Sequence, residues 1–168
     1  MKPRPHRLGF FLKKFFVMKI LMVCLGNICR SPMAEGILRK KSLETEKNWT
    51  IDSAGTSNYH IGEAPDSRAT QKSAKYDVDI SNLRGRQFSK SDFDKFDLIL
   101  AMDESNYSDI LRMARNEFDQ EKVKMILNYT HPGKNLAVPD PYYGGDASFE
   151  EVYKLLNDAC DKIIEDFG

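Results

Sequence analysis

Cys24 has a potentially nucleophilic thiol and Arg30 a cationic guanidinium, and the two residues stand six positions apart in the stretch VCLGNICRSP, residues 23–32. The apolar run before it, residues 19–23, predicts a buried strand, and residues 32–46 have the composition and spacing of a helix. A strand that leads through a tight loop into a helix directs backbone N–H groups and the helix dipole at one small volume, which suits a phosphate. In such a loop the guanidinium of Arg30 could bind two phosphate oxygens while the Cys24 thiol faces the phosphorus.

The same surroundings would favour the thiolate form of Cys24, and a thiolate facing a phosphate ester suggests covalent catalysis through a cysteinyl-phosphate. For a cysteine and an arginine at this spacing alone, a buried structural cysteine and a solvated arginine are the commoner arrangement. The complete stretch from Val23 to Pro32, however, resembles the signature loop of the low-molecular-weight protein tyrosine phosphatases at every position. The resemblance covers roughly residues 18–167. It implies a phosphate-binding loop made of Leu25, Gly26, Asn27, Ile28, Cys29, Arg30 and Ser31.

Asp140 is the candidate for proton transfer, and it lies between two prolines in the run VPDPYYGG, residues 138–145. Hydrolysis of an aryl phosphate needs a proton for the leaving oxygen and then a base for the attacking water. The prolines restrict the backbone and could hold the carboxyl at a fixed reach. A Pro-Asp-Pro sequence by itself is more often a turn, but DPYYG resembles the general-acid loop of the same family. The resemblance implies that Asp140 acts first as the acid and then as the base.

Further roles are implied by the resemblance alone. Asn27 and Ser53 match the pair whose hydrogen bond holds the phosphate loop, and Ser31 matches the residue that stabilises the departing thiolate. Asp103 matches a buried acid that orients the loop region, although a plain helix N-cap is an equally good interpretation. The residues that match the lining of the substrate crevice are Leu25, Ile28, Tyr59, Tyr142 and Tyr143.

Cys29 is the redox partner that the resemblance implies. Family members with this pair of cysteines can form a disulfide that protects the nucleophile, here Cys24, from over-oxidation. The alternative is that Cys29 is a small packing residue beneath the loop. The sequence departs from the family at Tyr76, where animal members have a histidine that contacts the loop.

Length and composition limit the remaining possibilities. The chain of 168 residues is long enough for one domain with a hydrophobic core and short for two. Lys plus Arg equals Asp plus Glu, with 25 of each, so the overall charge predicts neither nucleic acid nor an acidic membrane as a partner. Three cysteines, an odd number, favour a reducing compartment and hence a cytoplasmic protein. The scattered Cys and His residues predict no metal site, and we expect no cofactor.

No apolar run approaches the ~20 residues that a membrane-spanning helix needs. The partners implied are phosphotyrosine-containing proteins, a tyrosine kinase being one candidate, and we expect a monomer or weak dimer.

Strands alternate with helices along the chain, without hairpin signals. This order predicts a single α/β domain: a four-stranded parallel sheet with helices on both faces and a phosphate-binding loop after the first strand. The later strands are expected at 49–53, 96–102 and 123–127, with helices at 66–76, from 89–92, from 103 to about 116 and from 148 to 167. Catalytic loops should lie beyond the carboxyl ends of the strands, which is where Cys24, Ser53 and Asp103 fall.

Residues 1–17 are basic and Phe-rich and do not resemble the rest of the chain. Two lysines interrupt their apolar residues, so a secretory signal is a poor match, although an amphipathic surface-binding tail is conceivable. We expect a dispensable tail or a start assigned too far upstream, because Met18 is a natural beginning for the first strand. The phosphatase domain is then predicted at residues 18–168.

Three other activities use related loops. Arsenate reductases of the same fold need two further cysteines as a relay, and here only Cys160 remains outside the loop. Protein-arginine phosphatases typically carry threonine at the position of Ile28, so the isoleucine favours phosphotyrosine. A non-enzymatic phosphate-binding or phospho-carrier module would have no use for Asp140 on a loop framed by prolines.

Overall fold

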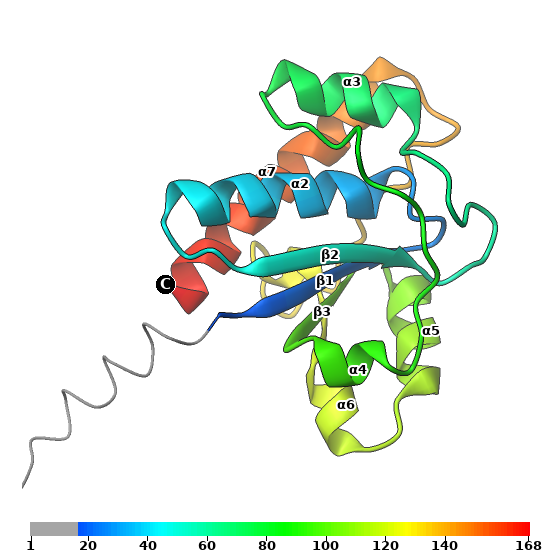
Figure 1. The fold of residues 1–168 in the computed structure, drawn as a ribbon, viewed down its shortest axis with the longest axis vertical. Helices are drawn as coiled ribbons and strands as arrows, with labels where there is room; N and C mark the ends of the chain where they lie inside the picture. Colours follow the sequence, from blue (N-terminus) through cyan, green and yellow to red (C-terminus); the bar gives the residue numbers. More distant parts are fainter. Residues whose placement is uncertain (1–16) are drawn as a thin grey trace, which may run out of the picture.

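A parallel sheet of four strands forms the centre of the computed structural model, which describes residues 17–168 (Figure 1). The strands are β1 (Lys19–Cys24), β2 (Thr50–Gly55), β3 (Leu98–Ala101) and β4 (Val123–Met125), in the spatial order β2-β1-β3-β4. The pairing of β1 with both β2 and β3 is parallel, as is that of β3 with β4. The fold predicted from the sequence is therefore confirmed, whereas the predicted N-terminal extension falls outside the described residues except for Val17.

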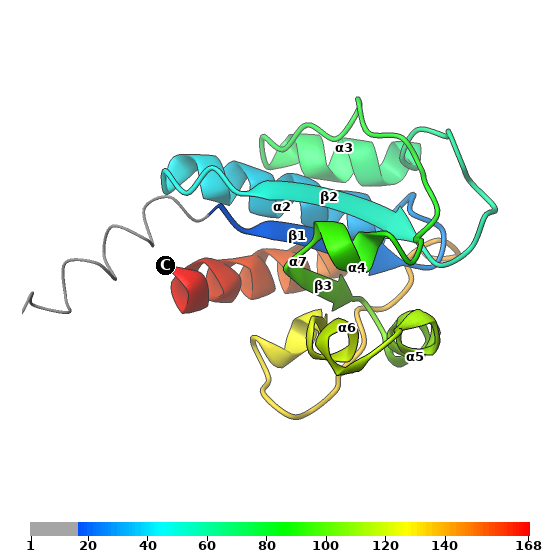
Figure 2. The ribbon, with the colours of Figure 1, turned by 60° about the horizontal axis from the view of Figure 1, so that its bottom comes forward.

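Helices cover both faces of the sheet (Figures 1 and 2). On one face α2 and α7 pack against the strands and α3 packs against these two helices, while α4, α5 and α6 lie on the other face. Their bounds are α2 (Arg30–Glu44), α3 (Ser67–Lys75), α4 (Asp92–Lys95), α5 (Glu104–Met113), α6 (Glu117–Glu121) and α7 (Asp146–Phe167), with a 3-10 turn, η1, at Ile126–Asn128.

Alternation along β1 explains why both faces are apolar. Ile20 and Met22 point into the core beneath α2 and α7, and Leu21 and Val23 point into the core beside α4 and α5. All four side chains are fully buried. Successive strand residues face opposite sides of a sheet, so a continuous apolar run is what a strand covered on both faces requires.

Several element ends differ from the prediction. Helix α2 starts at Arg30, within the predicted loop, so the last loop residues are already helical. The helix expected to reach about residue 116 ends at Met113, and α6 then starts anew because the Asn116 side chain caps it by accepting from the Asp119 N–H. Ser148 is not the cap of α7, since the helix begins at Asp146 and the Ser148 N–H already donates to the Gly145 carbonyl.

Candidate active site

Carbonyl groups of the loop between β1 and α2 accept hydrogen bonds from residues outside the loop. The Leu25 carbonyl accepts from the Ser57 N–H at 3.0 Å, and the Ile28 carbonyl accepts from the Asp66 N–H at 2.8 Å. In a planar trans peptide the carbonyl and the following N–H point in opposite directions. The N–H groups that follow Leu25 and Ile28 therefore face the interior of the loop, where an anion would bind.

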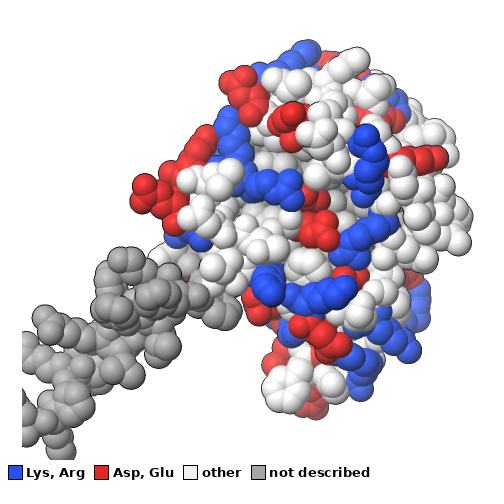
Figure 3. All heavy atoms as spheres, viewed as in Figure 1, with Lys and Arg blue, Asp and Glu red and all other residues white. Residues whose placement is uncertain are grey.

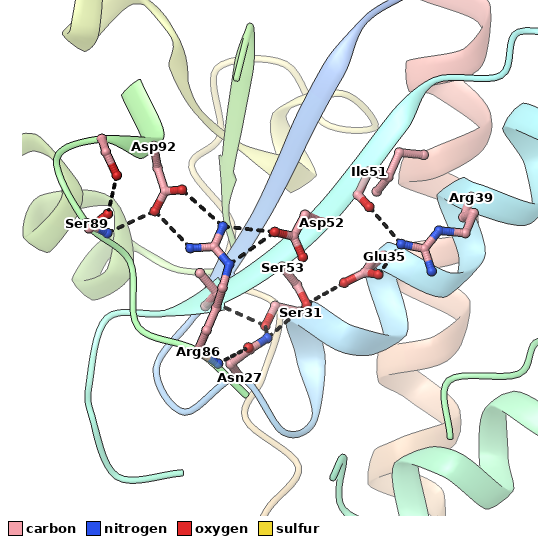
Figure 4. Close-up of polar contacts among 12 residues, drawn as sticks. Asn27, Ser31, Glu35, Arg39, Ile51, Asp52, Ser53, Arg86, Ser89 and Asp92 are labelled. Carbon is pink, nitrogen blue, oxygen red and sulfur yellow. Dashed lines mark hydrogen bonds and ion pairs between the residues drawn. The ribbon is translucent and has the colours of Figure 1, made fainter. Parts of the chain in front are cut away.

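Asn27 fixes the shape of this loop. Its φ of 58° lies in the left-handed region, which asparagine tolerates better than most residues. The side-chain amide donates to Ser31 Oγ at 2.8 Å and to Ser53 Oγ at 2.9 Å (Figure 4). Its Oδ1 accepts from the backbone N–H of Arg86 at 3.0 Å. The hydrogen bond between Asn27 and Ser53 that the family resemblance implied is thus present.

The thiol of Cys24 lies at the end of β1, and the residue is only 3% exposed. Its Sγ lies 3.0 Å from Ser31 Oγ and accepts from the Asn27 N–H at 3.3 Å. The Asn27 N–H would stabilise negative charge on the sulfur, and the Ser31 hydroxyl would do the same where it donates.

Glu35 ends the polar chain below the loop, and sequence reasoning missed it. This buried carboxylate accepts from Ser53 Oγ at 2.7 Å and pairs with Arg39, so the Ser53 oxygen is left to accept from Asn27 (Figure 4). Because Asn27 in turn donates to Ser31, the Ser31 hydroxyl hydrogen is free to point at the Cys24 sulfur. Burial raises the pKa of Glu35, although its hydrogen bond from Ser53 and the charge of Arg39 oppose the rise.

Arg86 is a second residue that sequence reasoning did not select. Its guanidinium binds both oxygens of the buried Asp92 at 3.0 and 3.1 Å and one oxygen of Asp52 at 3.1 Å (Figure 4). These contacts hold Arg86 in place, so that its backbone N–H can donate to Asn27 Oδ1. Ordinary sequence signals do not reveal such a contact, because 59 residues separate the two partners.

Arg30 is buried and preoriented. Its Nη1 donates to Asp103 Oδ2 at 2.7 Å and to the Val138 carbonyl at 3.0 Å. Burial opposes the charge of Arg30, but the nearby Cys24 and Asp103 outweigh it and raise the pKa of the guanidinium. Asp103 also caps α5, since its Oδ1 accepts from the Asn106 N–H at 2.8 Å. The Asp103 side chain is 23% exposed and so is not the buried acid that the resemblance implied, but it makes both the contact to Arg30 and the helix cap.

A cavity of about 300 Å³ opens above the phosphate loop. Asp140 stands at its mouth, with a side chain that is 47% exposed and an Oδ2 that lies 3.6 Å from Arg30 Nη2. The cavity includes every residue that was expected to line the crevice. Its full lining is Cys24, Leu25, Gly26, Ile28, Cys29, Arg30, Tyr59, His60, Asp140, Tyr142 and Tyr143.

Four residues singled out from the sequence do not line the cavity. They form hydrogen bonds behind the lining, and they are Asn27, Ser31, Ser53 and Asp103. His60, which had no predicted role, lines the cavity and pairs with Glu63.

Other sequence features lie further from the cavity. Cys160 is fully buried in α7. The Tyr76 ring stacks on the ring of Tyr153, also in α7, with 4.0 Å between the ring centroids. Within residues 17–168 no group of three or more His, Cys, Asp or Glu side chains is arranged to hold a metal ion. In the same part of the chain, no helix has both the length and the apolar character needed to cross a membrane.

Known proteins share this sequence and this fold. The family model described as low molecular weight phosphotyrosine protein phosphatase matches residues 19–168. A Synechocystis protein named as a low molecular weight protein-tyrosine-phosphatase is 48% identical over 153 residues, which cover 90% of this chain and 97% of that protein.

Two solved structures share the fold closely. A protein tyrosine phosphatase from Entamoeba histolytica with Hepes in the active site has a TM-score of 0.83 at 38% identity, covering 88% of this chain and 95% of that one. The Drosophila arginine phosphatase also has a TM-score of 0.83, at 32% identity, covering 89% of this chain and 98% of that one.

Proposed function

The chain belongs to the low molecular weight phosphotyrosine protein phosphatase family, and we propose that it hydrolyses phosphotyrosine in proteins through a cysteinyl-phosphate at Cys24. The main support is that Cys24, Arg30 and Asp140 line one cavity although they come from loops more than a hundred residues apart. The tyrosines beside Asp140 give that cavity flat walls suited to an aromatic ring.

In the first step the Cys24 thiolate attacks the phosphorus and the bond to the tyrosine oxygen breaks. Arg30 and the inward N–H groups of the loop bind the phosphoryl oxygens, which carry the negative charge of the transition state. Arg30 can do so without reorganising, because Asp103 and the Val138 carbonyl already hold it. Asp140 donates its proton to the leaving phenolate oxygen.

In the second step Asp140, now a carboxylate, takes a proton from water, and that water attacks the phosphorus. The sulfur–phosphorus bond breaks and inorganic phosphate leaves. The electron pair returns to Cys24, where the Ser31 hydroxyl, 3.0 Å away, stabilises the thiolate.

The substrates and the setting of the enzyme are part of the same proposal. We propose phosphotyrosine-containing proteins as partners, with a tyrosine kinase among them, and a chain that acts as a monomer or weak dimer. Its three cysteines are all free and buried, which fits the reducing cytoplasm.

A comparison of three phosphopeptides of one sequence tests the substrate class. We expect the purified protein to release phosphate from the phosphotyrosine peptide and to leave the phosphoserine and phosphoarginine peptides largely intact. The phosphoarginine arm matters because the Drosophila arginine phosphatase has the same fold. Preference for phosphoarginine would contradict the proposal and show that Ile28 does not decide the substrate class.

Cys29 is proposed as the redox partner of Cys24. Burial first, and then the charge of Asp66, raise the pKa of the Cys29 thiol, so peroxide should oxidise Cys24 rather than Cys29. Attack of the Cys29 sulfur on the Cys24 sulfenic acid would then form a disulfide and release water. Peroxide inactivation should be reversed by dithiol in the wild type and largely irreversible in Cys29→Ser. Equal recovery of both proteins would give Cys29 a packing role only.

A further inference from the structure

Asp140 has few contacts that fix its own position. Its Oδ1 accepts from the Tyr142 N–H at 3.1 Å, and its other oxygen lies 3.6 Å from Arg30 Nη2. The carboxyl group therefore depends on the turn that follows it, which the Gly144 N–H closes by donating to the Pro141 carbonyl at 2.8 Å. Whatever holds this turn also sets the reach of the general acid.

Arg68, in the first turn of α3, holds that turn from the side of the helix. Its Nη2 donates to the Tyr142 carbonyl at 2.9 Å, and its Nη1 donates to the Gly144 carbonyl at 3.2 Å. Tyr142 thus accepts from Arg68 through its carbonyl and donates to Asp140 through its N–H. A single residue, Tyr142, therefore links the Arg68 guanidinium to the Asp140 carboxyl group.

The guanidinium of Arg68 is itself fixed on several sides. Asp66 binds it at Nε (3.0 Å) and Nη2 (2.9 Å), and the ring of Phe149 in α7 lies 4.7 Å below it. The backbone N–H of Asp66 meanwhile donates to the Ile28 carbonyl of the phosphate loop. The short segment 66–68 therefore contacts both the loop with the nucleophile and the loop with the acid.

We infer that Arg68 is a positioning residue that sets the distance between the general acid Asp140 and the bound phosphate. The inference rests on the proposed function. Arg68 is absent from the cavity lining, so it acts through the turn 141–144 and not on the substrate. A planar guanidinium can donate to two carbonyls and a carboxylate at once, which the ammonium of a lysine cannot reproduce with the same geometry.

The leaving group of the substrate tests this role, because an acidic phenol departs without help from a proton donor. We would measure kcat/KM, which reports the first chemical step, for phosphotyrosine and for aryl phosphates with increasingly acidic phenols. Arg68→Ala should lose about 10-fold to 100-fold on phosphotyrosine, the size expected for a misplaced catalytic group. The loss should shrink as the phenol becomes more acidic. Arg68→Lys should fall between the wild type and Arg68→Ala.

Arg115→Ala is the matched control. Its side chain is 39% exposed, against 41% for Arg68, and it also pairs with aspartates, Asp94 and Asp119, which lie outside the cavity lining. Its dependence on the leaving group should equal that of the wild type. The double variant Arg68→Ala/Asp140→Ala should be no slower than Asp140→Ala alone, because both substitutions impair the same function, protonation of the leaving group.

Two results would overturn the inference: an equal loss on every leaving group, or losses that multiply in the double variant. Arg68→Lys allows the same comparison if Arg68→Ala does not fold. A wild-type protein without activity on any aryl phosphate would overturn the proposed function itself.

Discussion

A single buried carboxylate, Glu35, determines which way the hydrogen bonds run beneath the phosphate loop. As long as Glu35 is ionised, Ser53 must donate to it and Asn27 must donate to Ser53 and Ser31. The Ser31 hydrogen can then point at the Cys24 sulfur, which at 3.0 Å is nearer than the other acceptor within reach, the Ala54 carbonyl at 3.4 Å. The carboxylate thus orders the donor that the proposed second step needs, although it lies outside the cavity.

The raised pKa of Glu35 predicts a dependence of stability on pH. The folded protein binds this proton more readily than the unfolded chain, so the contribution of Glu35 to the free energy of unfolding is present at low pH. It is lost as the pH rises from about 4, the ordinary pKa of glutamate, through the higher folded value. Glu35→Gln lacks this titration. Thermal unfolding of both proteins over this range should show the stability of the variant, relative to wild type, rising with pH. A relative stability that falls would contradict the assignment.

Replacement of Asp140 by asparagine should remove proton transfer and retain the shape of the side chain. We expect Asp140→Asn to lose roughly 10²–10⁴-fold in kcat/KM on phosphotyrosine, the usual contribution of a general acid. The loss should be smaller for an aryl phosphate whose phenol is already acidic. Steady-state kinetics on both substrates check this. If both rates fell by the same factor, Asp140 would have a structural role.

At the scale of elements, a turn on one wall of the cavity depends on a glycine in another segment. The Gly85 N–H donates to the Glu63 carbonyl, and the Gly85 carbonyl accepts from the Gly62 N–H, both at 2.8 Å. A Cβ atom at residue 85 would lie 2.3 Å from the His60 carbonyl oxygen. A side chain at this position must therefore displace the turn that carries Tyr59 and His60 to the cavity.

Gly85→Ala should therefore disturb substrate binding more than chemistry. We expect KM for a phosphotyrosine peptide to rise while kcat changes less, because Cys24, Arg30 and Asp140 are held by other elements. Crowding of this kind costs about 1–3 kcal/mol, so the free energy of unfolding should also fall. Kinetics and denaturant unfolding measure the two effects. An unchanged KM would mean that the 60–63 turn does not contribute to binding.

The sequence predicted best the elements whose signal is local. The apolar run of β1 and the helical pattern of residues 66–76 identify a strand and a helix without knowledge of their neighbours. Helix α6 was missed because its five residues are too few for a periodic pattern, and only tertiary contacts sustain so short a helix. The break after Met113 had no glycine or proline to announce it.

The residues of the site also divide into those with a local sequence signal and those without one. Cys24, Arg30 and Asp140 could be selected because each lies in a motif of several residues that resembles a known loop. Glu35, Arg86 and His60 could not, since each sits in an ordinary segment and gains its role from a partner brought near by the fold.

At the scale of the whole molecule, the parallel sheet gathers the site by bringing the carboxyl ends of β1, β2 and β3 to one edge. The face seen in Figure 3 mixes basic and acidic side chains, without a broad area of one sign. The whole sequence has 25 basic and 25 acidic residues, so no net charge guides substrates, and we expect the contacts of the cavity itself to dominate recognition.

Removal of residues 1–17 should leave the enzyme unchanged. The Met18 carbonyl already accepts from the Thr50 N–H at 2.9 Å, and its side chain is buried, so we expect the domain to fold from Met18 onward. A protein that starts at Met18 should match the full chain in kcat/KM and in thermal unfolding. A clear loss of either would show that the segment contributes to the domain.

The proposed reaction depends on a cysteinyl-phosphate at Cys24, and trapping that intermediate tests the reaction directly. The wild-type protein would be mixed with an aryl phosphate, denatured within a turnover, digested and mapped by mass spectrometry. We expect a phosphoryl group on Cys24 in the wild type, and neither label nor turnover in Cys24→Ser, because a serine hydroxyl is a far weaker nucleophile than a thiolate. Turnover without phosphate on Cys24, or appreciable activity in Cys24→Ser, would contradict the proposed reaction.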